Sequence, residues 1–191
     1  MMKRNKCRFF GDDVAYTNHW TKISTNQIEV EVPEYFPGKE DFIKFYSAYN
    51  GGDFFEYSDF EPNPEFLLPT EFQDIDEWDV LGFYPISLPN EEGPSVSTYS
   101  VLTMKTTKKY SSTIQNQRDK FYQESAGEFK DFFSSHIPIA NDSSDSTYFI
   151  SIRTGEVKYL DFDDYFENPN LAFTVASSFS DFCKRIKKSS V

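Results

Sequence analysis

The chain has 191 residues, 21 of them Phe and 12 Tyr, and a formal net charge of −12. A chain of this length buries about 70% of the surface that its unfolded form exposes, so it needs no disulfides, and its aromatic content excludes a disordered acidic tail. The negative charge argues against nucleic acid as a partner and favours a basic one.

The cysteines and the hydropathy pattern predict a soluble cytoplasmic protein. Cys7 and Cys183 are the only cysteines, too few for a disulfide framework, and two free thiols suit a reducing compartment. Residues 1–13 lack the apolar core of a secretory signal, and no run of 18 apolar residues predicts a membrane span. We expect one domain over 1–191 and no membrane contact, and we leave self-association open.

The charge imbalance lies in one third of the sequence. Residues 45–104, called the acid-only segment below, contain twelve acids and no Lys or Arg, while the rest of the chain has 19 acids and 19 bases. A field of this sign would steer a basic partner toward the segment. The alternative is that these acids only keep an aromatic-rich protein in solution.

The first predicted elements are a strand and a helix. Residues 28–32, IEVEV, alternate apolar and acidic side chains, which predicts a half-buried strand. A helix should follow, because aromatic residues recur at three-to-four spacing on one face. These residues are Phe42, Phe45, Tyr46 and Tyr49. The glycines of Asn50-Gly51-Gly52 should end this helix in a left-handed conformation.

The middle of the chain is broken into short pieces by prolines. Residues 53–60 and 96–104 predict strands, and 70–83 predict a short acidic helix that runs into a turn. Residues 118–134 predict a longer helix, with Tyr122 and Phe129 on one face and Gly127 as a weak point.

A hairpin is predicted around Thr154-Gly155. A two-residue turn there would place Ile152 opposite Val157 and Arg153 opposite Glu156, so that both faces gain matched pairs.

The last predicted element is a helix with Ser178 as its N-cap and Asp181 as the third residue of a capping box. Phe179, Phe182 or Cys183, and Ile186 should form its buried face. Basic residues should gather at its negative end. They are Lys184, Arg185, Lys187 and Lys188.

Three segments occur in a distinctive order. They are YNGG at 49–52, IPIAND at 137–142 followed by a hairpin over 148–164, and VASSFSDFCKRI at 175–186. Together they resemble the SUKH superfamily, the Smi/Knr-like domain. The matching positions are Tyr49, Asn50, Gly51, Gly52, Ile137, Pro138, Ile139, Ala140, Asn141, Asp142, Gly155, Val157, Ala176, Ser178, Phe179 and Phe182.

The resemblance implies an α+β fold, a mostly antiparallel sheet with helices packed against it, and a binding module rather than an enzyme, without cofactors. Residues 1–27 then form an N-terminal extension and about 86–135 an insertion. Bacterial members of the superfamily are commonly immunity proteins that neutralise toxins, often nucleases. Fungal members are similar to regulators of cell-wall glucan synthesis.

No local pattern predicts catalysis or a metal site. His19 and His136 have no partner at ligand or triad spacing, and no pair of acids is marked as general acid and general base. An enzyme would need a concave site with perturbed titrating groups.

Two acidic sets that contain aromatic residues are the candidate partner-binding sites, because rings next to charges make good anchors. The first set is Asp74, Asp76, Glu77, Trp78 and Asp79, and the second is Asp161, Asp163, Asp164, Tyr165 and Glu167. The competing interpretation is that the rings belong to the core and the acids are merely solvated.

These observations favour an immunity protein that covers the active-site surface of a basic toxin with acids. The alternative hypothesis is a regulatory or scaffold protein of the glucan-synthesis type that binds a host factor.

Overall fold

The computed structural model describes residues 9–11, 14–17, 21–54, 58–75, 78–86, 129–144, 146–161 and 172–189. The helices are α1 (Thr25–Glu31), α2 (Lys39–Tyr49), the 3₁₀ helix η1 (Thr70–Phe72), α4 (Phe129–Ser134) and α5 (Phe179–Lys184). The strands are β1 (Tyr16–Thr17), β2 (Gly52–Phe54), β3 (Ser58–Phe60), β4 (Gly82–Phe83), β5 (His136–Asn141), β6 (Thr147–Ser151), β7 (Val157–Leu160), β8 (Phe173–Ala176) and β9 (Ile186–Lys188).

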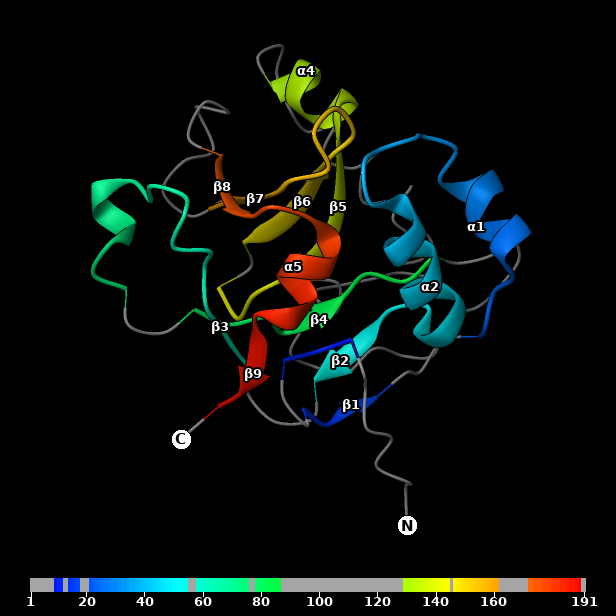
Figure 1. Cartoon of the computed structure of the whole chain (residues 1–191), viewed down its shortest axis with the longest axis horizontal. Helices are drawn as coiled ribbons and strands as arrows, with labels where there is room; N and C mark the ends of the chain where they lie inside the picture. Colours follow the sequence, from blue (N-terminus) through cyan, green and yellow to red (C-terminus); the bar gives the residue numbers. More distant parts are fainter. Residues whose placement is uncertain are drawn as a thin grey trace.

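The strands form a seven-stranded antiparallel sheet in the order β1-β2-β4-β5-β6-β7-β8, and β3 pairs with β9 in a separate two-stranded sheet (Figure 1). This confirms the predicted α+β class with an antiparallel sheet. The segment between β3 and β4 extends to one side of the body in Figure 1, and α4 lies at one end of β5.

The main core lies between the large sheet and two helices. The predicted aromatic face of α2 is buried except for Tyr49, which is partly buried. Phe42 and Phe45 each lie 5.4 Å from the ring of Phe179 on α5. The opposite face of the sheet carries a smaller cluster around Phe149. Because both faces are covered, all five residues of β6 are buried.

The end of α2 differs in detail from the prediction. Asn50, not a glycine, is the left-handed C-cap, with φ of 44°. Its side chain donates to Thr21 O and Ile86 O, both at 2.8 Å, and accepts from Ile86 N at 3.0 Å. Gly51 follows with φ of 79°, and a Cβ there would lie 2.7 Å from Pro85 Cα. The Asn-Gly pair therefore ends the helix and also holds the chain beside β4.

The strand predicted at 28–32 is wrong, because these residues belong largely to α1. Ser24 and Gln27 form a capping box that starts the helix. Ile28 and Val32 lie on one buried helical face, while Val30 is 74% exposed. Apolar residues that alternate over 28–32 also place Ile28 and Val32 at i and i+4, as in a helix. The capping box at Ser24 therefore selects the helix over the strand.

The predicted hairpin exists, but its register is wrong by two residues. Ile150, not Ile152, pairs with Val157. The turn is longer than the two residues predicted, and hydrogen bonds from Gly155 N to Ser151 O at 2.8 Å and from Ser151 N to Glu156 O at 2.9 Å close it. A shift of two keeps each side chain on its face, so the buried pattern survives.

The C-terminal helix is shorter than predicted. Ser178 is the N-cap as expected and accepts from Asp181 N at 3.1 Å. The Asp181 carboxylate reaches back to Ser177 N at 2.9 Å rather than to the cap residue. Residues 186–188, expected to continue the helix, form β9 against β3, with Ile186 opposite Phe60.

The remaining predictions have mixed outcomes. The strand predicted at 53–60 is divided into β2 and β3, and the short acidic helix is η1. The strand predicted at 96–104 and the start of the helix predicted at 118–134 lie outside the described residues, and the helix is seen as α4 from Phe129. In the N-terminal extension, β1 adds an edge strand and Phe10 is buried in the core. Of the helices described, none has the length and apolar character to cross a bilayer.

Candidate functional site

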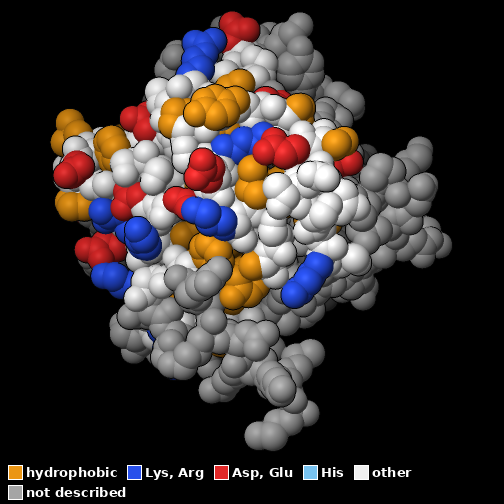
Figure 2. All heavy atoms as spheres, turned by 45° about the vertical axis from the view of Figure 1, so that its right-hand side comes forward, with side chains coloured by type: hydrophobic (Ala, Val, Ile, Leu, Met, Phe, Trp, Pro, Cys, Tyr) orange, Lys and Arg blue, Asp and Glu red, His pale blue; other side chains and the backbone are white. Residues whose placement is uncertain are grey.

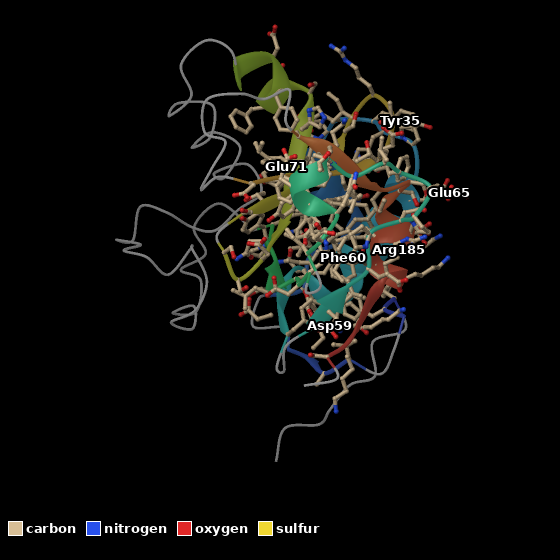
Figure 3. The ribbon with its side chains drawn as sticks, turned by 90° about the vertical axis from the view of Figure 1, so that its left-hand side faces the viewer. Tyr35, Asp59, Phe60, Glu65, Glu71 and Arg185 are labelled. Carbon is tan, nitrogen blue, oxygen red and sulfur yellow. The ribbon has the colours of Figure 1, made fainter. Side chains whose placement is uncertain are left out.

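The segment 61–75, called the acidic loop below, connects β3 to η1 and continues toward β4. It contains four acids and no Lys or Arg. Its acids Glu65, Glu71 and Asp74 are exposed, and Leu67 is 89% exposed. Figure 3 views this face, with Glu71 on η1 and Glu65 nearer the β3 end of the loop.

Asn63 fastens the first half of the acidic loop to the body. This residue is only 5% exposed. Its backbone N–H donates to Val175 O on β8 at 2.8 Å, and its side chain donates to Asp181 on α5 at 2.9 Å. Its side-chain oxygen also accepts from Glu65 N at 3.0 Å. The backbone and the side chain of this one buried asparagine therefore join the loop to a strand and a helix.

Phe72 fastens the second half of the loop in a box of aromatic rings. Its ring centroid lies 4.8 Å from that of Phe173, 5.9 Å from that of Trp78 and 6.1 Å from that of Tyr159. Buried rings in tilted and edge contacts are worth more than their area alone. The exposed acids Glu71 and Asp74 therefore flank a residue that is firmly packed.

Trp78 lies beneath this surface. It is 8% exposed, and its ring is 5.0 Å from Tyr159 in an edge contact. This burial agrees with the core interpretation of the ring. A direct contact between Trp78 and a partner stays a prediction.

The two acidic sets, which are distant in sequence, meet at the turn between β5 and β6. Asp79, Asp142 and Asp161 form what we call the acidic corner. Ser143 N donates to Asp79 at 3.4 Å, and the Ser146 hydroxyl donates to Asp161 at 3.1 Å. The turn 142–146 therefore holds one member of each predicted set at the same end of the sheet.

Asp142 is the buried member of the acidic corner, at 5% exposure. One carboxylate oxygen accepts from Ser144 N and Ser146 N at 3.0 and 2.9 Å, and the other accepts from the Tyr159 hydroxyl at 2.7 Å. Burial raises the pKa of Asp142 to about 6, and the charge of Asp79 adds to this, while the hydrogen bonds oppose it. Burial and the nearby Asp142 charge likewise raise the pKa of Tyr159. Sequence reasoning missed Asp142 as a site residue, since only its place in the fold surrounds it with acids.

Four of the ten predicted positions are described, Asp74, Trp78, Asp79 and Asp161, and six are not. Asp74 is exposed at the end of the acidic loop, and Asp161 is partly exposed at the end of β7. Asp76, Glu77, Asp163, Asp164, Tyr165 and Glu167 lie outside the described residues.

The basic C-terminal residues compensate part of the acid-only segment, which the sequence did not predict. Lys187 lies opposite Asp59 in the β3–β9 pair and forms an ion pair with Glu61. Arg185 pairs with Asp181 at 2.8 Å, and in the view of Figure 3 it lies between Glu65 and Asp59. Figure 2 shows acidic and basic side chains similarly interspersed on another face. The excess of acid is therefore greatest away from the base of the loop, toward Glu71 and Asp74.

His136 is a structural residue. Its ring stacks on Phe132 with centroids 3.9 Å apart, and its Nδ1 lies 2.8 Å from Phe132 O. Burial lowers the pKa of His136 to about 4. Among the residues that the structure describes, no group of three His, Cys, Asp or Glu side chains could hold a metal ion.

Comparison with models of protein families gives a match over most of the chain. The model of the SMI1 / KNR4 family (SUKH-1) matches residues 39–185. The matched range includes α2, the acidic loop, the acidic corner and α5. Neither the curated proteins nor the solved structures gave a match.

Proposed function

The chain belongs to the SMI1 / KNR4 family (SUKH-1), and from this premise we propose that it is a non-catalytic protein-binding module, an immunity protein that neutralises a basic toxin of the nuclease type. It acts by covering the active-site surface of the toxin, in the cytoplasm, and performs no reaction itself.

The acidic loop is the observation that carries the proposal. Exposed acids on a loop fixed at Asn63 and Phe72 present a negative surface of constant shape. Such a surface steers a basic partner during encounter and raises the association rate. A nuclease needs a basic surface to hold nucleic acid, so it offers the complementary charge.

A regulatory or scaffold protein of the glucan-synthesis type is the second candidate, because the family resemblance covers both kinds of protein. The gene neighbourhood separates the two. A toxin gene beside this one favours the immunity protein, whereas its absence favours the regulator.

Charge reversal tests the proposed surface. Where a toxin gene lies beside this one, the probe is its purified, catalytically inactive toxin domain. The double substitution Glu71→Lys and Asp74→Lys should lower the association rate with that domain by about tenfold or more in low salt. The loss should shrink as salt is added, because screening removes long-range steering. Stopped-flow fluorescence at several salt concentrations measures both effects.

Glu40→Lys with Asp131→Lys is the matched control, because both acids are exposed and lie on α2 and α4. It makes the same change in net charge away from the acidic loop. Equal association rates for the two double variants would show that net charge, rather than this surface, guides the partner.

A further inference from the structure

We propose that Leu67 is the apolar anchor of the interface, and that it inserts into an apolar pocket rimmed by Lys and Arg on the basic partner. This inference rests on the proposed function and specifies how the acidic loop makes contact. It assigns the slow dissociation of the complex to one side chain, while the acids around it set the rate of encounter.

The exposure of Leu67 is informative because the neighbouring leucine is packed against the core. A single exposed Leu is common on protein surfaces and needs no explanation. Leu67 is 89% exposed, whereas the next residue, Leu68, packs against the main core. The backbone therefore turns one leucine inward as an attachment and the other fully outward.

The backbone on both sides of Leu67 is held in place. Phe66 N donates to Asn63 O at 3.0 Å, and the Gln73 side chain donates to Leu68 O at 2.8 Å. Pro64 and Pro69 further restrict the segment. A fixed loop loses little conformational entropy when a partner binds, so its apolar contact contributes more to affinity.

Charge identifies the kind of pocket that Leu67 fits. Glu65 and Glu71 are the acids that flank it in the loop. The bases that contact Glu61 at the start of the loop are already engaged, because Arg185 pairs with Asp181 and Lys187 pairs with Glu61. An apolar pocket surrounded by bases therefore matches this part of the surface in both polarity and charge. An apolar core within a polar rim is the usual arrangement of a protein interface.

Val30 supplies a matched control, because it is an apolar residue that is 74% exposed on α1. Neither Leu67→Asp nor Val30→Asp removes a buried side chain, so both variants should keep the thermal unfolding temperature of the wild type. The probe is the same inactive toxin domain that tests the proposed function. We expect Leu67→Asp to raise its dissociation rate by about tenfold or more and Val30→Asp to leave that rate unchanged.

Leu67→Ala separates loss of the anchor from the added charge. It should raise the dissociation rate with no change in the salt dependence of association. In hydrogen exchange, the amides of 65–71 should become protected in the complex, and those of α1 should not.

Each result has a definite meaning. If the wild type binds the probe and Leu67→Asp dissociates no faster than Val30→Asp, the anchor is disproved while the proposed function stands. If the wild type does not bind the probe, the proposed function fails, and the anchor fails with it.

Discussion

The α2–α5 side of the sheet and the acidic corner are both buried, yet they are built from different chemistry. The first consists of aromatic rings, among them Phe42, Phe45 and Phe179, each at most 1% exposed. The second buries the carboxylate of Asp142 beside two further acids. Packing alone explains the first region. The second retains a buried carboxylate because its oxygens accept hydrogen bonds from Ser144 N, Ser146 N and the Tyr159 hydroxyl, and an apolar residue would leave these donors unpaired.

The largest expected effect lies in the aromatic region. Phe45→Ala should lower the free energy of unfolding by about 3–5 kcal/mol, because it removes a fully buried ring and leaves a cavity. Urea denaturation measures this. Leu67→Ala is the control and should cost less than about 0.5 kcal/mol, since its side chain is already in water. Similar losses for the two variants would contradict the assigned core.

A second, pH-dependent effect is expected at the acidic corner. The pKa of Asp142 is raised from 3.8 to about 6, so the folded state holds a proton that the unfolded state has released. Stability contributed by Asp142 is therefore present below about pH 4 and lost as pH rises toward 6. Asp142→Asn should remove this loss, so its stability relative to the wild type should rise across this window by up to about 3 kcal/mol.

The difference between the two proteins must be measured, because His136 titrates in the same range. Its lowered pKa makes stability fall as pH decreases, which is the opposite sign, and it is present in both proteins. Tyr159→Phe sharpens the test. Removing the hydrogen bond that favours the carboxylate should raise the folded-state pKa of Asp142, so the upper end of the window should move to higher pH while its lower end stays in place. A pH-independent difference between wild type and Asp142→Asn would disprove the buried charge.

The smallest effect is expected at the start of α5, on the aromatic side. Ser178→Ala should cost about 1 kcal/mol, because the N–H of Asp181 loses its acceptor. Ser180→Ala, at the second residue of the helix, should leave the stability of the protein unchanged or raise it slightly. Thermal unfolding of the two variants makes the comparison. Equal changes would mean that the cap does not contribute.

The sequence predicted the aromatic region better than the acidic one, for a physical reason. The aromatic faces of α2 and α5 follow local periodicity, and Ser178 carries a local cap signal, so a single segment contains the information. The acidic corner depends on pairing between β5, β6 and β7, which brings Asp79 and Asp161 to one turn. No local pattern in either acidic set indicates this meeting.

The errors in prediction have specific causes. The segment at 28–32 satisfies both a strand and a helix, and the capping pair Ser24 and Gln27 was the overlooked signal. The hairpin turn is closed by bonds from Gly155 N to Ser151 O and from Ser151 N to Glu156 O, and the predicted two-residue turn did not allow for them. The strand β9 exists only because β3 is available to pair with it.

The pairing of β3 with β9 has a consequence for synthesis of the chain. Glu61 and Lys187 are 126 residues apart, so at translation speeds of 5–20 residues per second β3 waits roughly 6–25 s for its partner. During that time the ring of Phe60, which later faces Tyr148 and Phe182, has no cover from the C-terminal strand. During this interval the nascent protein has an unpaired apolar edge at β3, which chaperones can bind. Pairing with the last strand, β9, covers that edge.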